Sequence, residues 1–113
     1  MEWQIIYNNK IEQWLDNLTK KQLKYVAKEL KLLEMAGHTL KLPHSRSLGS
    51  GLFELRERKF GYRLYYCFAK KQLILLLTAG NKTSQLKDIT IARKLLIQFR
   101  RHSNENTKLQ NIP

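Results

Sequence analysis

The segment Leu52–Phe68 constrains the fold most, because two alternating apolar runs in it flank a short polar turn. Phe53 and Leu55 share one face of the first run, and Leu64 and Tyr66 share one face of the second. A slip of one residue between paired strands would move every side chain to the opposite face of the sheet. Placing both apolar faces on the same side therefore predicts an antiparallel β-hairpin with a four-residue turn.

This register brings two positive charges together. Arg56 lies directly opposite Arg63 on the other face of the hairpin, and Arg58 follows in the turn. Like charges facing each other across a strand pair destabilise a sheet by roughly 0.2–1 kcal/mol, and a broken local rule is typical of a functional site. We therefore expect both guanidinium groups to project side by side into solvent and to bind a phosphate, whose oxygens they match. The alternative is a pair of surface arginines balanced by Glu54 or Glu57.

The net charge also favours an anionic ligand. The 113 residues include 21 Lys and Arg against nine Asp and Glu, which gives a formal charge of +12. Between Arg58 and Asn104 the only acid is Asp88. Such an imbalance favours a polyanionic partner, most often nucleic acid, with an anionic membrane or an acidic protein as competitors. Charge kept for solubility alone is the remaining interpretation.

Cysteine and apolar content exclude several classes. Cys67 is the single cysteine, so no disulfide framework is available, and its place among aromatic residues predicts a buried side chain. The longest apolar run, Leu73–Leu77, is far shorter than the roughly 20 residues of a membrane span. The first residues lack the basic and apolar regions of a signal peptide, so we expect a cytoplasmic protein with no membrane partner. The three histidines lack metal-ligand spacing and no acid cluster is present, so we expect neither metal nor cofactor.

The order of the expected elements predicts an α+β fold. Asn9 with Glu12, and Thr19 with Gln22, resemble helix N-caps with their reciprocal partners. We expect a small, twisted, mostly antiparallel sheet packed against this N-terminal helical hairpin, followed by a C-terminal helix. Residues 1–102 would form one domain, and residues 103–113 a flexible tail. The other expected features are a strand at Trp3–Tyr7, an inward stripe of Leu23, Val26, Ala27, Leu30 and Leu33 on the second helix, a helix stop at Gly37, a loop at His38–Gly51, a strand at Leu73–Thr78, a turn at Ala79–Thr83 and a helix at Ser84–Arg101.

Three short motifs carry a family resemblance. They are Gly-Leu-Phe-Glu-Leu-Arg at residues 51–56, Gly-Tyr-Arg-Leu-Tyr-Tyr at 61–66, and Gly-Asn-Lys-Thr at 80–83 ahead of a helix. With this spacing the chain resembles the RelE/ParE superfamily of toxins, and within it the HigB-type, phage-derived addiction module killer branch. The resemblance implies a small twisted sheet with two N-terminal helices on one side. It also implies a ribosome-dependent endoribonuclease that cuts mRNA in the A site, and a cognate antitoxin, HigA-like with a helix-turn-helix.

The resemblance extends to individual site residues. Arg56, Arg63 and Lys82 fall where family members place the basic residues that grip the scissile phosphate, and Arg58 matches a position that is often basic. Some members carry a tyrosine or histidine near the start of the last helix, suited to proton transfer. Here that stretch contains Asp88, which is either a substitute base or an acid favoured in the first turn of a helix.

The implied reaction needs no metal. The RNA supplies its own 2′-hydroxyl, which attacks the adjacent phosphorus and expels the 5′-oxygen; the protein orients the nucleotide, stabilises the phosphoryl charge and helps to move protons. Glu54 shares the face of Arg56 and is either a base or a residue that orients arginines. Tyr65 lies on the same face and either stacks on a base or is a covered sheet aromatic. Lys82 lies in a turn whose free N–H groups would attract anions, or is a solvated loop lysine.

Other cations would contact RNA without base specificity. Lys59 follows Arg58 in the hairpin turn, and Lys24, Lys28 and Lys31 line the outer face of the second helix, where they would meet ribosomal RNA. Two other functions share these features. One is a ParE-like gyrase inhibitor, a binding toxin without catalysis, and the other is a basic nucleic-acid-binding module.

Overall fold

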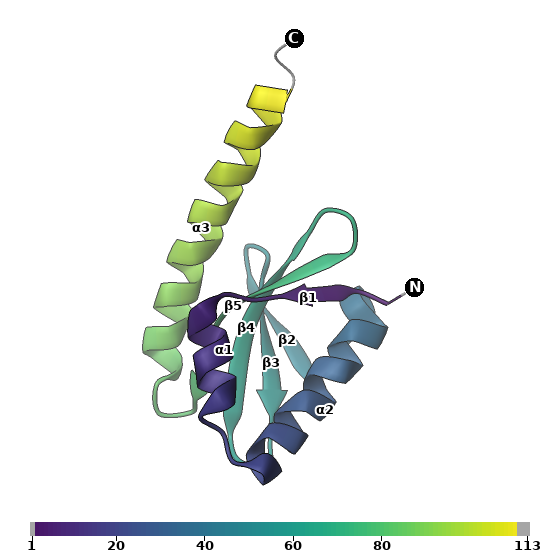
Figure 1. Cartoon of the computed structure of the whole chain (residues 1–113), viewed down its shortest axis with the longest axis vertical. Helices are drawn as coiled ribbons and strands as arrows, with labels where there is room; N and C mark the ends of the chain where they lie inside the picture. Colours follow the sequence, from purple (N-terminus) through teal and green to yellow (C-terminus); the bar gives the residue numbers. More distant parts are fainter. Residues whose placement is uncertain (1, 111–113) are drawn as a thin grey trace.

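A five-stranded sheet organises the chain (Figure 1). The computed structural model describes residues 2–110, with side chains up to His102. The strand order is β1-β5-β4-β3-β2; β1 and β5 run parallel, and all other neighbours run antiparallel. The elements are β1 (Gln4–Ile6), α1 (Asn9–Asp16), α2 (Lys20–Ala36), the 3-10 helix η1 (Gly37–Thr39), β2 (Ser45–Gly49), β3 (Leu52–Glu57), β4 (Tyr62–Ala69), β5 (Leu73–Asn81) and α3 (Gln85–Gln110).

Local signals start and stop the two N-terminal helices. The side chain of Asn8, one residue before the expected cap, accepts a hydrogen bond from the Ile11 N–H and caps α1. Thr19 and Gln22 form the expected capping box at the start of α2. Gly37 ends α2 with φ at 52°, in the left-handed region that favours glycine.

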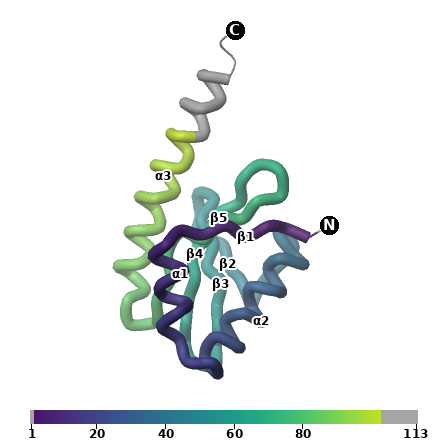
Figure 2. The backbone as a smooth tube through the Cα atoms, viewed as in Figure 1, coloured from purple at the N-terminus to yellow at the C-terminus, as the bar shows by residue number. Residues whose placement is uncertain are grey.

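The sheet separates two apolar cores. On one face, α1 and α2 pack onto a cluster that includes Val26, Leu33, Leu55 and Leu64. On the other face, α3 packs onto a second cluster (Leu52, Tyr65, Cys67, Leu77, Ala92 and Leu96). Figure 2 shows α3 and α2 on opposite sides of the strands. The expected α+β architecture is confirmed.

The predicted hairpin register is confirmed in full. Strands β3 and β4 pair Leu55 with Leu64 and Arg56 with Arg63, as the apolar alternation required. Strand β5 is flanked by β1 and β4 and contributes to both cores, which explains its unbroken apolar run.

Several expectations about element bounds and faces were wrong. The expected loop His38–Gly51 contains strand β2, which pairs with β3 and is anchored by a hydrogen bond between the Ser45 and Tyr66 hydroxyls. Helix α3 continues to Gln110, because neither Gly nor Pro interrupts residues 81–112; of the expected tail, residues 103–110 are helical and 111–113 lie outside the described residues. Strand β5 extends to Asn81, three residues beyond the expected end. On α2, Leu23 and Ala27 are exposed.

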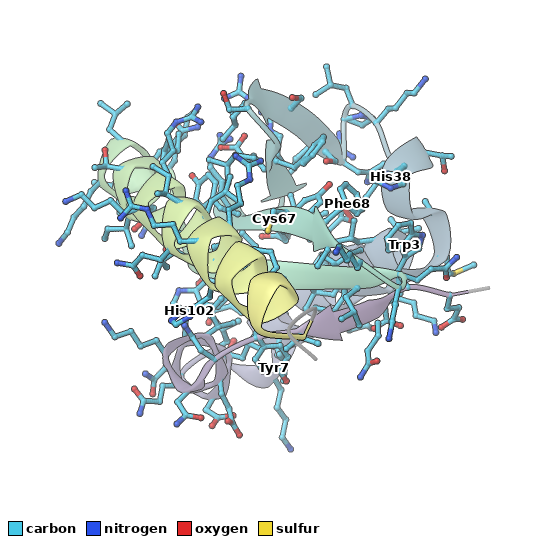
Figure 3. All side chains as sticks on the ribbon, turned by 90° about the horizontal axis from the view of Figure 1, so that it is seen from above. Trp3, Tyr7, His38, Cys67, Phe68 and His102 are labelled. Atoms are coloured by element: carbon cyan, nitrogen blue, oxygen red, sulfur yellow. The ribbon has the colours of Figure 1, made fainter. Side chains whose placement is uncertain are left out.

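Burial of two other groups follows the sequence pattern. Cys67 is buried beside α3, and burial raises the pKa of its thiol to about 11. Trp3, His38 and Phe68 gather away from α3 in edge-on and tilted ring contacts (Figure 3). None of the helices within residues 2–110 is both long and apolar enough to cross a bilayer.

Candidate active site

The candidate site lies on the α3 face of the sheet, where β3, β4 and β5 present charged side chains. Arg56 on β3 lies opposite Arg63 on β4, and Arg63 in turn pairs with Gly80 on β5. On both hairpin strands, every second residue points away from the α1–α2 core, and its side chain lies on this face. The predicted pairing of two guanidinium-bearing residues is therefore present, in the middle of the sheet and not at its edge.

Glu54 is the centre of this cluster. Its carboxylate is fully buried and accepts hydrogen bonds from Arg63 Nη1 (2.9 Å), Arg46 Nε (3.2 Å) and the Gln85 amide (2.8 Å). Arg56 Nε lies 4.0 Å from the same carboxylate. A carboxylate removed from water needs such partners, because desolvation of an unpaired charge costs several kcal/mol. Three guanidinium groups surround this one carboxylate, so the cluster carries a net positive charge.

The expectation that both arginines project freely into solvent was wrong for Arg63. Its side chain is 10% exposed and hydrogen-bonded to Glu54, whereas that of Arg56 is 31% exposed. The like-charge pair is compensated by Glu54, which lies on the same face of β3 two residues before Arg56. Compensation is incomplete, since the buried Nε atoms of Arg56 and Arg63 find no hydrogen-bond partner among the described residues. Both N–H groups are buried, so a ligand can reach this arginine pair only through the exposed part of the Arg56 side chain.

Tyr65 lies beneath this cluster and cannot offer its ring to a base. The residue is fully buried among the side chains that pack against α3, which fits the covered sheet aromatic, one of the two roles considered for it. Burial, and secondly the negative charge of Glu54, raise the pKa of Tyr65, so it stays protonated. Its hydroxyl makes no hydrogen bond of normal geometry within the described residues.

Asp88 joins the cluster from the first turn of α3. It is 8% exposed and accepts a hydrogen bond from the Ser84 hydroxyl. A Cβ at Gly80 would lie 2.0 Å from Asp88 Oδ2, so only glycine allows the carboxylate to approach β5 this closely. Because Gly80 pairs with Arg63, Asp88 lies over the strand next to the arginine pair. Both roles considered for it, base and first-turn acid, fit this position.

Lys82 is exposed in the turn directly after β5. Two of the N–H groups expected to be free in this turn are paired. Asn81 Oδ1 accepts hydrogen bonds from the N–H groups of Thr83 (2.9 Å) and Ser84 (3.1 Å). Lys82 lies at the same end of the sheet as the hairpin turn, since Asn81 pairs with Tyr62.

The remaining predicted cations divide between two places. Arg58 and Lys59 are exposed in the hairpin turn, near the arginine pair. Lys24, Lys28 and Lys31 are exposed on α2, which packs on the opposite face of the sheet from the Glu54 cluster. The pKa of Lys31 is raised by a hydrogen bond to Glu2, 3.3 Å away, and by the charges of Glu2 and Glu34. These lysines do not extend the arginine cluster.

Sequence reasoning missed Arg46 and Gln85. Arg46 falls within the expected loop His38–Gly51, but strand β2 pairs it with Glu54. Gln85 begins α3 and reaches Glu54 across the sheet. The signal for Arg46 was its position in Ser45–Gly49, where an edge strand would place alternate residues on the site face; Gln85 gave no signal in the sequence.

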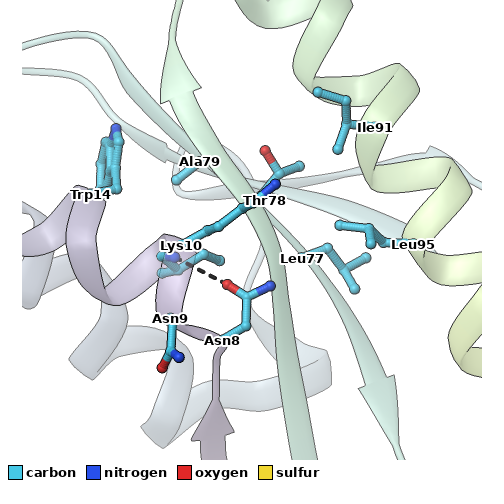
Figure 4. A pocket seen from close by; sticks show the side chains of 10 residues that line it. Asn8, Asn9, Lys10, Trp14, Leu77, Thr78, Ala79, Ile91 and Leu95 are labelled. Atoms are coloured by element: carbon cyan, nitrogen blue, oxygen red, sulfur yellow. Dashed lines mark hydrogen bonds between the residues drawn. The ribbon is translucent and has the colours of Figure 1, made fainter.

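An apolar groove lies elsewhere, between α1, β5 and α3 (Figure 4). It has a volume of about 600 Å³, and its walls include Trp14, Leu77, Ile91 and Leu95. Lys10 is its single charged lining residue, so the groove is poorly suited to a polyphosphate. Within the described residues no group of three His, Cys, Asp or Glu side chains is placed to hold a metal.

Comparisons with known proteins identify a family for the chain. The family model described as phage derived protein Gp49-like matches residues 13–97. A comparison with curated proteins yields no significant match.

Solved structures of RelE toxins share the fold. A free mutant form of the E. coli toxin RelE superposes with a TM-score of 0.66 at 14% identity, covering 83% of this chain and 97% of that chain. RelE in the archaeal RelE–RelB complex from Pyrococcus horikoshii gives 0.61 at 20% identity, covering 73% and 97%. The RelBE2 toxin–antitoxin complex from Mycobacterium tuberculosis gives 0.56 at 17% identity, covering 73% and 100%. The chain therefore belongs to the phage-derived Gp49-like family and has the fold of RelE toxins.

Proposed function

We propose that the protein is the toxin of a type II toxin–antitoxin system, of the HigB type, and that it cleaves mRNA in the ribosomal A site. The observation that carries this proposal is the excess of guanidinium groups around Glu54, where Arg56 lies opposite Arg63 and its side chain, with its guanidinium donors, is partly exposed. A phosphodiester supplies the anionic oxygens that such donors require. The proposed catalyst works in the cytoplasm and uses neither metal nor cofactor.

The proposed reaction assigns a separate role to each group. The 2′-hydroxyl of the RNA attacks the adjacent phosphorus, the bond to the 5′-oxygen breaks and that oxygen takes a proton from water, and a cyclic phosphate forms. Arg56, which is partly exposed, and Lys82 contact the phosphoryl oxygens as their charge grows. The positive charge of the more deeply buried Arg63 adds to this stabilisation. Arg58 and Lys59 hold the flanking backbone, and Lys24, Lys28 and Lys31 contact ribosomal RNA.

Glu54 is better suited to orienting arginines than to accepting a proton. Both of its oxygens already accept hydrogen bonds, one from Arg46 and Arg63 and the other from Gln85. Asp88 is the stronger candidate for a base, because Ser84 is its one side-chain hydrogen-bond partner within the described residues. We therefore assign proton abstraction to Asp88 and orientation to Glu54.

The proposed partner is an antitoxin, HigA-like and carrying a helix-turn-helix. RelE proteins of the same fold occur in complexes with RelB antitoxins, and one E. coli RelE structure contains an antitoxin peptide. A chain of charge +12 favours a partner segment rich in Asp and Glu.

Burial of Arg63 favours one alternative. A ParE-like gyrase inhibitor acts by binding and needs no accessible catalytic cations, so a sheltered arginine cluster would be purely structural in it. Primer extension on mRNA from translating cells, with and without induction of the protein, separates the two functions. Cuts inside translated codons support the proposal, whereas DNA breaks with intact mRNA support the gyrase alternative.

Arg56→Ala is the sharpest variant for this experiment. Arg63→Ala would leave the buried Glu54 carboxylate short of a partner and would destabilise the fold, which confuses loss of activity with loss of structure. We expect Arg56→Ala to lower cleavage by about a hundredfold, the usual effect of removing one donor to a developing oxyanion. Lys70→Ala removes an exposed cation at the other end of β4 and should cut normally. Persistent cleavage by Arg56→Ala would contradict the proposal.

A further inference from the structure

A second polar cleft lies on the α2 side of the sheet, where the hairpin turn meets the helix. It has a volume of about 160 Å³ and is lined by Tyr25, Lys28, Glu29, Glu57, Arg58 and Lys59. Helix α2 supplies the first three residues, and the end of β3 with its turn supplies the others. The cleft is therefore separate from the Glu54 cluster, which faces α3.

The floor of the cleft is acidic and fixed in place. Glu29 is 7% exposed, and its Oε1 lies 2.8 Å from Nδ1 of His44. Glu57 is 3% exposed, and both of its oxygens accept hydrogen bonds from N–H groups of the turn, at Lys59 and Phe60. Glu57 is thereby committed to the turn. Oε2 of Glu29, by contrast, accepts no hydrogen bond from the described residues and remains available to a donor.

The rim of the cleft is cationic and unpaired. Lys28, Arg58 and Lys59 are exposed, and within the described residues their side chains form no ion pair, although two carboxylates line the same cleft. Tyr25 forms an aromatic wall, and its ring is held edge-on against Phe60 at 5.6 Å between centroids. A ligand that fits this arrangement carries an anionic group, a flat ring and a hydrogen-bond donor.

We propose that this cleft binds a guanine nucleotide of the RNA substrate. Guanine presents two donors, N1–H and the 2-amino group, on one edge, and both can converge on Oε2 of Glu29, the oxygen that His44 leaves free. Its ring lies against Tyr25 and its phosphate is held by Arg58, while Lys59 is placed for the next phosphate of the strand. That the nucleotide belongs to RNA rests on the proposed function, whereas its recognition rests only on the residues of the cleft.

Binding of mononucleotides to the full-length protein tests the assignment without ribosomes. Titration with 5′-GMP, 5′-IMP and ribose 5-phosphate, followed through the NMR signals of Tyr25 and of the turn amides, separates base recognition from charge. We expect 5′-GMP to bind at least tenfold more tightly than ribose 5-phosphate, and 5′-IMP, which lacks the 2-amino group, to fall between them. Equal affinity for all three probes, or no binding of any, would overturn the proposal.

Variants assign the roles within the cleft. Glu29→Gln should remove the preference for 5′-GMP over 5′-IMP, and Arg58→Ala, an exposed substitution without effect on folding, should weaken all three probes alike. Lys70→Ala removes an exposed cation at the far end of β4 and should leave every affinity unchanged. An unaltered base preference in a folded Glu29→Gln protein would also overturn the proposal. Guanine binding without mRNA cleavage in cells would leave the cleft assignment intact and reject the proposed nuclease.

Discussion

At the scale of single residues, one carboxylate decides whether the arginine cluster can exist. Glu54 is fully buried and supports Arg46, Arg63 and the nearby Arg56 at once. Removing one partner of a buried ion pair leaves the other charge uncompensated, at a cost of roughly 3–5 kcal/mol. We therefore expect Glu54→Gln, which keeps the shape and removes the charge, to lower the free energy of unfolding by about that amount in urea denaturation.

A matched control exists for this substitution. Glu12 is exposed in the first turn of α1, so Glu12→Gln should change stability by less than about 0.5 kcal/mol. Equal stabilities of the Glu54 and Glu12 variants would show that the cluster does not depend on its carboxylate.

The contact between Gly80 and Asp88 gives a second test. A methyl group at Gly80 would lie 2.0 Å from Asp88 Oδ2 and 2.5 Å from Ser84 Oγ, so Gly80→Ala should push the start of α3 away from β5 and cost about 1–3 kcal/mol. In an Asp88→Ala background one of these clashes is gone, and the same substitution should cost less. A double-mutant cycle in urea measures the difference. Strict additivity of the two substitutions would refute the contact.

Cys67 gives a dependence on pH. Burial raises the pKa of its thiol from the ordinary 9.0 to about 11, so the folded chain keeps a proton that the unfolded chain loses. This contribution is fully present below pH 9 and is lost as the pH rises towards 11, with a slope of at most about 1.4 kcal/mol per pH unit. Urea titrations across that range should show a shallower decline for Cys67→Ala than for the parent protein. Parallel curves would contradict the burial.

At the scale of elements, the sequence predicts those features that depend on apolar alternation or on helix capping. The β3–β4 register follows from two one-sided apolar runs, and the α2 start follows from the Thr19–Gln22 capping box. Strand β2 escaped prediction because Ser45–Gly49 is polar and forms an edge, so pairing with β3 rather than an apolar pattern makes it a strand. Without β2, the place of Arg46 beside Glu54 could not be deduced.

Long-range contacts explain the other failures. Glu29 is buried on α2 because His44, fifteen residues away, pairs with it, and no local pattern contains that information. Leu23 was assigned to the core by helical spacing, but it is 40% exposed. Similarly, the accessibility of Arg63 and Tyr65 depends on how closely α3 covers the sheet, which the separate strands and helices do not specify.

Helix α3 and the β2–β3 turn are joined by two arginines. Arg93 donates to the carbonyl oxygens of Leu48 (2.8 Å) and Gly49 (3.4 Å), and Arg100 donates to that of Ser50 (2.7 Å). Arg93→Ala should release the turn, so amide hydrogen exchange in residues 45–52 should become faster while the α2 core stays protected. Arg101→Ala, which removes an exposed arginine one residue from Arg100, should leave exchange unchanged. Unchanged exchange in Arg93→Ala would show that Arg93 does not hold the turn.

At the scale of the whole molecule, a charge of +12 should dominate affinity for RNA. If Arg56, Arg58, Lys59 and Lys82 each neutralise one phosphate, log K for single-stranded RNA should fall with log salt at a slope of about −2.8. Fluorescence anisotropy with a labelled oligonucleotide measures that slope, and Arg58→Ala should reduce its magnitude by about 0.7. A slope near zero would indicate that the charge has another purpose.

Because each face of the sheet packs against a different core, the hairpin cannot tolerate a one-residue shift that moves its side chains to the opposite face. One extra residue inside Leu52–Glu57 would exchange the surroundings of Leu55 and Arg56, forcing a guanidinium group against α2 and an apolar side chain towards the proposed substrate. Folding and toxicity would disappear together. Homologues should therefore vary in length at the β4–β5 turn or beyond α3 and keep a constant number of residues in this hairpin.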